Sequence, residues 1–386
     1  MRENFAIINF FGGKCRASAI RADFSDKKLE LSESFDFPAD NCFSALENFF
    51  SFVFYPRAYS AVFIFPPDEA AGFCGTVSAV RSEPGKKISE EELGDSVSGA
   101  VWKFFDAGRS KALKQLKSSE PEIMLSDVSV CDFKVDGRKV INPFSQGGRK
   151  IDLELGETFA NRARLKKMIK LLPRRSRKAF IFEGGVCAIR LLKRISGKSK
   201  FIFAKTSESE TDIFCGGGEE AGFRDYFSWG ERNLCRGISE SLKIGLSEGR
   251  AVAEKALAGG VSAHFRKNFE KIFLNEMASL AQGLKAGASA SGAKQIYLDF
   301  PFAGEAAGKG LKFKNISTKM ITPVDFSGIL EKFGFEISIP EDEKSKADFL
   351  LAAAVLEIYF SPVQSYPLSL LNRLAKRRMM WLMPNG

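Results

Sequence analysis

FAIINFFGGKCRASAIRA, residues 5–22, is the stretch of the chain that decides the fold. Two apolar runs flank Gly12-Gly13-Lys14, where glycine allows the positive φ of a tight turn, so the stretch predicts a β-hairpin. A comparable stretch, FIFAKTSESETDIFC at residues 201–215, again predicts two strands, here around a polar loop. A helical stretch follows each hairpin, at 42–50 and at 232–242. The order strand, turn, strand, helix therefore occurs twice.

The region between the two copies has a different pattern. A turn near residue 82 precedes Ser89, which predicts a helix N-cap because Glu92 follows three residues later, as in a capping box. Strand-like segments then lead to the turns Asp136-Gly137 and Asn142-Pro143, whose residue types are set by backbone geometry. We expect a small α+β insert over residues 84–156.

The duplicated layout and the insert resemble the actin-like bacterial proteins of the FtsA and PilM type. The most specific likeness runs from Ile88-Ser89-Glu90-Glu91-Glu92 through Asp136-Gly137 to Asn142-Pro143-Phe144, and it is similar to the SHS2-type subdomain of FtsA. The resemblance implies an α/β fold, the two-lobed actin-like ATPase (ASKHA) fold with a small α+β insert. It divides the chain into an opening segment of the first lobe (1–83), the insert (84–156), a closing segment of the first lobe with the crossover (157–198), the second lobe (199–366) and a basic amphipathic tail (367–386).

The bulk composition restricts the chemistry. The 386 residues are 45% hydrophobic and 27% charged, with a net charge of +10, as in an ordinary soluble protein. Seven scattered cysteines without a CxxC pair argue against a disulfide framework and a zinc site, and the single histidine, His264, argues against a His-based triad. We find no secretory signal and no apolar run long enough to span a bilayer, so we expect a cytoplasmic protein, or one peripheral to the membrane.

The first hairpin departs from the nucleotide motif of the family. The resemblance implies that ATP lies between the lobes, where two hairpin turns present backbone N–H groups to the phosphates. The family's first turn reads roughly D-I-G-S-S-K. Aligned on Lys14, this chain has Asn9 in place of the carboxylate and Phe11 in place of a glycine.

The second hairpin and the adenosine loop depart further. Lys205 stands at the family's Asp position, and Ser207-Glu208-Ser209 replaces its glycines. Glu208 places a negative charge where phosphates lie, and two like charges this close repel by about 1 kcal/mol even in water. The adenosine loop, an apolar strand followed by two glycines in the family, reads Tyr297-Leu298-Asp299-Phe300-Pro301.

These changes predict weak or no ATP hydrolysis, with no catalytic residue, no metal ligand and no bound cofactor. The cleft residues that the resemblance assigns are Asn9, Gly12, Gly13, Lys14, Lys205, Thr211, Asp212, Glu254 and Lys255. Two alternatives stay open, and with them ATP and Mg²⁺ as ligands. In the first, the alignment shifts at Lys14, so that Gly12-Gly13 form the phosphate turn and Asn9 is a weaker ligand. In the second, Lys14 and Lys205 bind an anion without a metal. The glycine-rich stretch 304–310 is interpreted as a surface loop.

The last residues form a basic amphipathic pattern. Leu371, Leu374 and Ala375 share one helical face, while Arg373, Lys376 and Arg377 lie mostly away from it. This pattern suits a helix in a membrane interface, and FtsA-like proteins end in such a tether; it equally suits a terminal helix docked on its own domain. The candidate membrane residues are Leu371, Arg373, Leu374, Lys376, Arg377, Trp381 and Leu382.

The sequence thus predicts an actin-like scaffold or adaptor of bacterial cell division that tethers a division-ring polymer or another partner at the membrane. A PilM-like cytoplasmic component of type IV pilus assembly is the alternative. The alternative from another class is a working actin-like ATPase with divergent phosphate loops. Expected partners are proteins of the division or pilus machinery, an anionic membrane surface, and further copies of the chain as a dimer or polymer. No nucleic acid is expected, because the basic segment 162–178 lacks interleaved aromatic residues.

Overall fold

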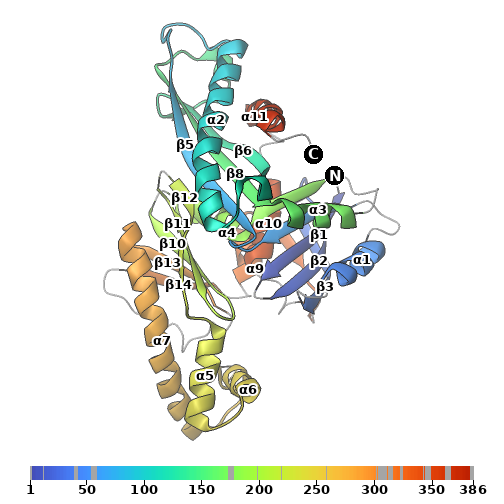
Figure 1. Ribbon diagram of the computed structural model, residues 1–386, viewed down its shortest axis with the longest axis vertical. Coiled ribbons are helices and arrows are strands. Elements are labelled where there is room, and N and C mark those ends of the chain that lie inside the picture. Colours follow the sequence, from blue (N-terminus) through green and yellow to red (C-terminus); the bar gives the residue numbers. More distant parts are fainter. Residues whose placement is uncertain are drawn as a thin grey trace.

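A computed structural model places two β-sheets, a helical layer between them and an insert above them (Figure 1). The residues that the structure describes are 2–11, 13–38, 42–53, 59–172, 178–197, 199–218, 220–257, 259–300, 302, 311, 316–321, 325–341, 343, 349–360 and 367–382.

The first lobe is built on a six-stranded sheet in the order β15-β3-β2-β1-β4-β9. β1, β2 and β3 form an antiparallel meander, and β4 and β9 continue the sheet in parallel. β4 is buried throughout, as an apolar run between two helical layers requires. The strands are β1 (Arg2–Phe11), β2 (Lys14–Asp23), β3 (Lys28–Pro38), β4 (Ser60–Phe65), β9 (Ala179–Glu183) and β15 (Glu336–Ser338).

The second lobe repeats this topology. β10, β11 and β12 form the antiparallel meander, and β13 and β14 continue it in parallel. The order β12-β11-β10-β13-β14 therefore matches β3-β2-β1-β4-β9, which confirms the duplication predicted from the two hairpin sequences. The strands are β10 (Phe201–Thr206), β11 (Thr211–Gly216), β12 (Glu220–Phe227), β13 (Gln295–Asp299) and β14 (Ser317–Ile321).

Two helices lie between the sheets and share one core with both. Phe5 and Ile7 of β1 and Phe203 of β10 belong to the same buried cluster as Ile189 of α4 and Leu350 of α10. Other helices cover the outer faces: α1 and α3 on the first sheet, and α5, α6 and α7 on the second. The helices of the lobes are α1 (Cys42–Val53), α3 (Arg162–Leu171), α4 (Gly184–Ser196), α5 (Glu231–Leu242), α6 (Leu246–Leu257), α7 (Ala263–Ser291), α9 (Asp325–Lys332) and α10 (Phe349–Tyr359).

The insert extends the sheet of the second lobe. β5 (Ala70–Val80) pairs with β12 at one end and with β8 (Lys150–Asn161) along its length, followed by β6 (Ile123–Val135) and β7 (Arg138–Lys139). The helix α2 (Glu90–Gln115) packs on this sheet, and the Ser89 hydroxyl accepts a 3.0 Å hydrogen bond from the Glu92 backbone N–H, as the N-cap prediction requires. Short 3₁₀ helices lie at Glu120–Glu122 and Pro143–Ser145.

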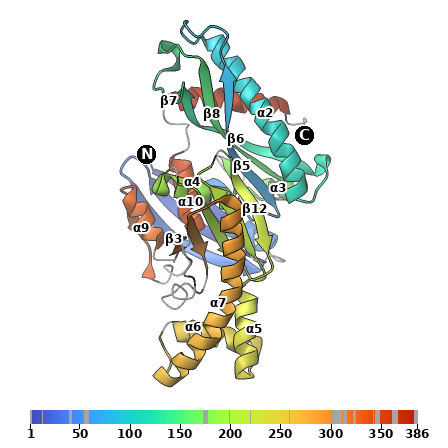
Figure 2. The ribbon, with the colours of Figure 1, turned by 90° about the vertical axis from the view of Figure 1, so that its left-hand side faces the viewer.

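The C-terminal helix α11 (Leu368–Leu382) lies against the insert (Figure 2). Leu371 and Ala375 are fully buried in the core of the insert. The Asn372 side chain accepts a hydrogen bond from the Val130 N–H and donates one to the Val130 carbonyl, both at 2.9 Å. β6 has an irregular register at this point, so the side-chain amide bonds to backbone groups of Val130.

Four of the described strands were not predicted. β3 lies in a polar, Asp-rich stretch, β14 and β15 lie at 317–321 and 336–338, and β5 lies in residues 70–80, before the predicted start of the insert at residue 84. Because β5 pairs with β8 over its whole length, the sheet of the insert includes residues 70–80.

Candidate functional site

The turns of both hairpins open onto one cleft of about 510 Å³. Gly13 and Lys14 contribute from the first hairpin, and residues 207–210 with Asp212 contribute from the second. The turn between β4 and β5, the helix α3 and the start of α5 complete the lining. The structure therefore brings together two predicted loops that lie far apart in the chain.

Phe11 stands at the mouth of the first hairpin. It ends β1 and lines the cleft, with the Arg16 guanidinium 5.3 Å and the Lys205 ammonium 5.9 Å from its ring centroid. Gly13 has a φ of +74°, so the tight turn itself forms as predicted. Gly12 lies outside the residues that the structure describes. A bulky ring thus occupies the position at which the resemblance implies a glycine.

Backbone hydrogen bonds close the turn of the second hairpin and join it to the start of α5. The Ser207 N–H donates to the Glu210 carbonyl at 2.8 Å, and the N–H groups of Glu231 and Arg232 donate to the carbonyls of Ser207 and Glu208 at 3.0 and 2.8 Å. The first N–H groups of a helix are the usual donors to a bound anion. At α5 two of them donate to the loop instead.

Gly230 is required for this contact between the loop and α5. A Cβ atom at this position would lie 2.6 Å from the backbone of Glu208. A second helix N-terminus near the cleft is also occupied, because the Glu183 carboxylate accepts 2.8 Å hydrogen bonds from the N–H groups of Gly185 and Val186 at the start of α4. Burial raises the pKa of Glu183 to about 8.

The lining of the cleft carries more carboxylates than cations. The carboxylates are Asp68, Glu69, Glu208, Glu210 and Asp212, and the cations are Lys14, Arg164 and Arg232. Arg164 is already bound to Glu69, with 3.0 Å between its Nε and the carboxylate oxygen. Four carboxylates then face two exposed cations, so the lining favours a cationic ligand over a polyphosphate.

Asp212 is the most deeply placed of these carboxylates. It is 7% exposed, lines the cleft, and forms no hydrogen bond or ion pair with any residue within the described ranges. Burial raises its pKa to about 7, and repulsion from Glu210 adds to the shift, whereas Lys205 opposes it. The ionised form of Asp212 is therefore poorly stabilised by the protein itself.

Aromatic side chains pack together at the predicted adenosine loop. Phe300 and Phe302 follow β13 and are buried, and the Phe300 ring lies 6.0 Å from Trp229 and 5.8 Å from Phe302. The Arg250 guanidinium lies 5.8 Å from the Phe302 ring and is paired with Glu231. Pro301 lies outside the described part of the chain.

Several predicted cleft residues lie elsewhere. Asn9 is 3% exposed within β1 and is not among the lining residues, and Thr211 is fully buried, its hydroxyl donating to the Trp229 carbonyl at 2.7 Å. Glu254 and Lys255 are exposed on α6, where Glu254 accepts from Arg250 at 3.0 Å. Lys205 is not among the lining residues, but its ammonium lies 5.9 Å from the Phe11 ring centroid and it stands directly opposite Asp212 in the β10–β11 pair.

Residues 66–69 and Arg164 also line the cleft, although the sequence did not predict their place there. Pro66-Pro67-Asp68-Glu69 directly follows the buried strand β4, which runs parallel to β1. Ligand sites in α/β sheets lie at the carboxyl ends of parallel strands. The continuous apolar run at residues 61–65, followed by two prolines, was the signal in the sequence for this part of the site.

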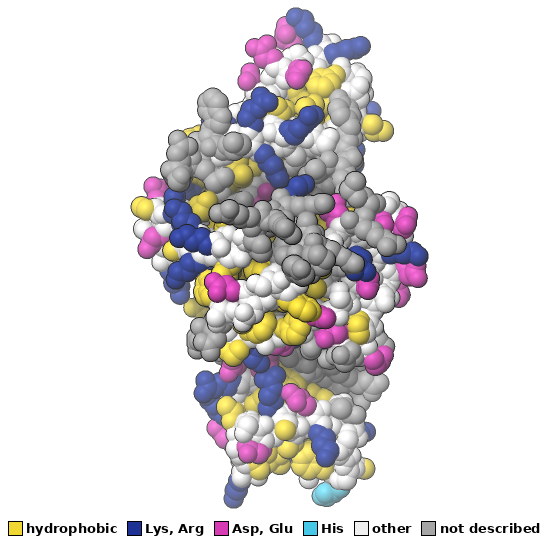
Figure 3. Space-filling model, turned by 90° about the vertical axis from the view of Figure 1, so that its right-hand side faces the viewer, with side chains coloured by type: hydrophobic (Ala, Val, Ile, Leu, Met, Phe, Trp, Pro, Cys, Tyr) yellow, Lys and Arg dark blue, Asp and Glu magenta, His cyan; other side chains and the backbone are white. Residues whose placement is uncertain are grey.

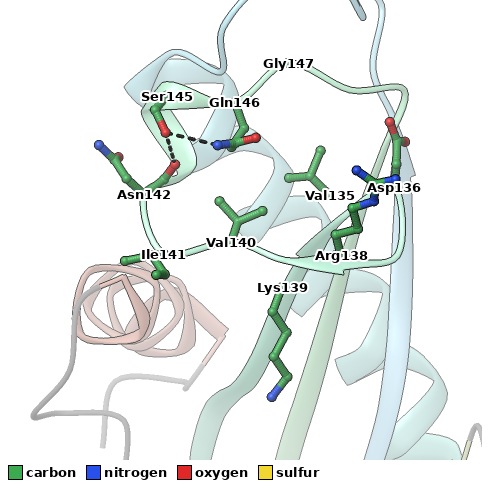
Figure 4. A pocket seen from close by; sticks show the side chains of 10 residues that line it. All are labelled: Val135, Asp136, Arg138, Lys139, Val140, Ile141, Asn142, Ser145, Gln146 and Gly147. Carbon is green, nitrogen blue, oxygen red and sulfur yellow. Dashed lines mark hydrogen bonds between the residues drawn. The ribbon is translucent and has the colours of Figure 1, made fainter.

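A second hollow of about 650 Å³ lies at the tip of the insert, between the Asp136-Gly137 turn and the Asn142-Pro143 turn (Figure 4). Asp136 and Gly137 have φ values of 48° and 76°, and the Asp136 carboxylate accepts from the backbone N–H groups of Arg149 and Lys150. The Ser145 hydroxyl donates to the Asn142 carbonyl at 2.9 Å. The residue types of both turns thus follow from the backbone conformation and the local hydrogen bonds, without any need for a ligand in the hollow.

The predicted membrane residues lie on α11. Leu371 is buried against the insert and Leu374 is half-buried, while Arg373, Lys376 and Arg377 are exposed. The side chains of Trp381 and Leu382 lie outside what the structure describes. Among the helices within the described ranges, none is both long and apolar enough to cross a membrane.

Comparisons with known proteins identify the fold. No family model and no curated protein matches the sequence. Among solved structures, the chain is similar to the PilM–PilN type IV pilus biogenesis complex, with 9% identity and a TM-score of 0.52 over 96% of this chain and 97% of that one. A Bacteroides thetaiotaomicron protein described as having an actin-like ATPase fold matches with 10% identity and a TM-score of 0.39 over 85% and 96%. MreB 5 of Spiroplasma citri bound to AMPPNP matches with 9% identity and a TM-score of 0.38 over 82% and 91%.

The chain therefore has the actin-like ATPase fold, as the sequence predicted. An FtsA-type identity in particular does not follow from these likenesses.

Proposed function

We propose that this chain is an actin-like adaptor that holds a protein partner and does not use ATP. The observation that carries the proposal is the lining of the cleft, in which four carboxylates outnumber two exposed cations. A triphosphate carries several negative charges of its own and would meet this lining with repulsion.

The first backbone N–H groups of two helices near the cleft are also not free to bind an anion, because two of α5 donate to the loop and two of α4 donate to Glu183. Phe11 and Glu208 stand where the family has glycine. The residues present therefore do not fit Mg·ATP.

A PilM-like role in type IV pilus assembly is the form of the adaptor that we favour. The structural likeness to PilM, in a complex with PilN, covers nearly the whole of both chains. Docking of α11 supports this form over a division protein tethered by its tail, because Leu371 is buried in the insert and is not free to enter lipid.

A membrane-associated division scaffold is the second candidate. It is favoured by the exposed basic residues of α11, Arg373, Lys376 and Arg377, which can contact anionic lipid while the helix stays docked. Basic side chains lie along the length of the face shown in Figure 3, interspersed with acidic and apolar ones. Sedimentation with phosphatidylserine vesicles, comparing the wild type with Arg373→Glu/Arg377→Glu, tests this candidate: only a lipid-bound scaffold loses binding in the variant.

Calorimetry tests the adaptor proposal. Mg·ATP is titrated into the wild-type chain and into an Asn9→Asp/Lys205→Asp variant, which restores the two carboxylates of the family's motif. We expect no binding heat from the wild type. Micromolar binding of Mg·ATP by the wild type would overturn the proposal, whatever the variant does.

A further inference from the structure

The cleft between the two hairpins has the properties of a site for a cation. Asp212 is 7% exposed, lines the cleft, and has no hydrogen-bond or ion-pair partner within the described ranges. A buried carboxylate without a partner is costly, so proteins normally supply one or leave the position for a ligand.

We infer that this cleft binds an arginine side chain carried by an extended segment of a protein partner. The inference rests on the proposed function, because it requires a cleft that nucleotide does not occupy. It names the chemistry of the partner: a cationic segment that enters between the β1–β2 turn and the β10–β11 turn.

The charges around Asp212 select a cation. Glu210 and Asp68 face it and disfavour its ionised form, and the neighbouring Lys205 opposes them without forming an ion pair with Asp212. The remaining cations of the lining, Lys14 and Arg232, are exposed at the rim. A guest cation at the floor of the cleft would therefore supply the partner that Asp212 lacks among the described residues.

The spacing and the apolar lining select an organic cation. Among the described residues, no three His, Cys, Asp or Glu side chains are grouped so as to hold a metal ion. Phe10, Phe11, Pro66 and Pro67 give the cleft apolar walls. A guanidinium binds carboxylates through two parallel N–H groups and stacks on aromatic rings, whereas an ammonium is a strongly hydrated point charge. Arginine fits this combination better than lysine.

The size of the cleft agrees with a short peptide. A volume of about 510 Å³ lies within the range of sites that enclose a small ligand, so it accommodates a short stretch of a longer segment. Charge complementarity is local: the chain as a whole carries +10, so a cationic peptide is repelled elsewhere on average. Binding of such a peptide would therefore report on this acidic cleft.

Fluorescence anisotropy with a labelled Gly-Arg-Gly-Arg-Gly peptide tests the inference. The matched control peptide carries citrulline in place of arginine, which keeps the shape and removes the charge. The test variant is Asp212→Asn and the control variant is Glu240→Gln, an exposed carboxylate on α5 outside the cleft. We expect the wild type to bind the arginine peptide in preference to the citrulline peptide. Asp212→Asn should weaken that binding by about tenfold or more, while Glu240→Gln leaves it unchanged.

Three results would overturn the inference: no binding of the arginine peptide, equal binding of the citrulline peptide, or equal effects of the two variants. Misfolding does not complicate the comparison, since Asp212→Asn removes an unpaired buried charge. The calorimetric titration with Mg·ATP separates the two proposals. Nucleotide binding overturns the adaptor, whereas absence of binding by both ligands overturns only the arginine site.

Discussion

Two charged side chains in the interior of this protein, Arg190 and Asp212, differ in whether neighbouring residues compensate for their burial. At the junction of α4, α10, β5 and β6, the Arg190 guanidinium donates to Glu357, to the Cys74 sulfur at 3.0 Å and to the Ser129 hydroxyl at 3.5 Å. The side chains of Arg190 and Glu357 are each 14% exposed. Asp212 in the cleft is as deeply placed but has no bonded partner among the described residues.

The difference separates a structural cluster from a binding site. Arg190 joins the first lobe to the insert, and its partners come from three other elements, so the protein itself compensates for its burial. Asp212 opens onto a cleft, and Lys205, directly opposite it on β10, favours its ionised form without forming an ion pair with it. Burial alone is common to both; only the presence of partners distinguishes them.

The largest effect is expected at the satisfied cluster. Arg190→Met leaves Glu357 buried and unpaired, so we expect the free energy of unfolding to fall by about 3–5 kcal/mol. Urea denaturation followed by circular dichroism measures the loss. The matched control is Arg250→Met, whose partly exposed ion pairs contribute only about 0–1 kcal/mol. Equal losses of unfolding free energy in the two variants would show that Arg190 is no more important for stability than an exposed ion pair.

Substitution of Asp212 is expected to raise the free energy of unfolding, in contrast to substitution of Arg190. Its pKa is about 7 in the folded chain and near 3.8 in the unfolded one, so the folded state retains a proton that the unfolded state releases. Stability therefore falls as pH rises from about 4 to 7. Asp212→Asn removes this loss, and we expect a gain of roughly 1–3 kcal/mol at pH 8 that shrinks toward pH 5.

The pH series for Asp212 has a built-in control. Glu210, Asp68 and Lys205 face Asp212, and Glu183 also interacts with it, but all four are present in both proteins. The difference between the two unfolding curves then reports the charge of Asp212 together with its effect on the pKa of Glu183. A variant that is less stable than the wild type at pH 8 would show that Asp212 has an internal partner after all.

An intermediate loss of stability is expected when α11 loses its hydrogen bonds to β6. Asn372→Ala leaves the Val130 N–H and carbonyl unbonded and buried, at a cost of about 1–3 kcal/mol to the docking of α11. Amide hydrogen exchange would show faster exchange in α11 and the central part of β6, with the two lobes unchanged. Unaltered exchange in α11 would contradict the docked arrangement. The exposed Arg373→Ala serves as the control.

The smallest effect is expected at Glu254. Its side chain is 56% exposed and its partner Arg250 has a second carboxylate, Glu231, nearby. Glu254→Gln should change the free energy of unfolding by less than about 0.5 kcal/mol and leave peptide binding by the cleft unaltered. A clear loss of binding would return Glu254 to the site that the resemblance implied.

The topology could be predicted because the same hairpin pattern occurs twice in the sequence. Each hairpin places two apolar runs around a turn, and a local pattern of this kind survives without tertiary information. β5 could not be found in this way. Gly72 and Gly75 weaken its strand pattern, and Gly72 is there because a Cβ would lie 2.8 Å from a methyl group of Val186 on α4. That reason exists only in the folded protein.

The site was predicted in part for the same reason. Lys14 and Asp212 were found because they lie in the hairpins, whereas Asp68 and Arg164 reach the cleft only through the packing of other elements. The amphipathic pattern of the tail was equally compatible with lipid and with protein. Asn372, a polar residue beside the apolar face, is the position that distinguishes them, because its amide matches two backbone groups of β6.

Thermal unfolding of the wild-type chain with and without millimolar Mg·ATP tests the central claim most directly. A ligand that binds the folded state raises the melting temperature to an extent set by its concentration and affinity. The acidic cleft predicts an unchanged melting temperature with Mg·ATP. A rise of several degrees that Asp212→Asn alters would contradict it and identify the cleft as a nucleotide site.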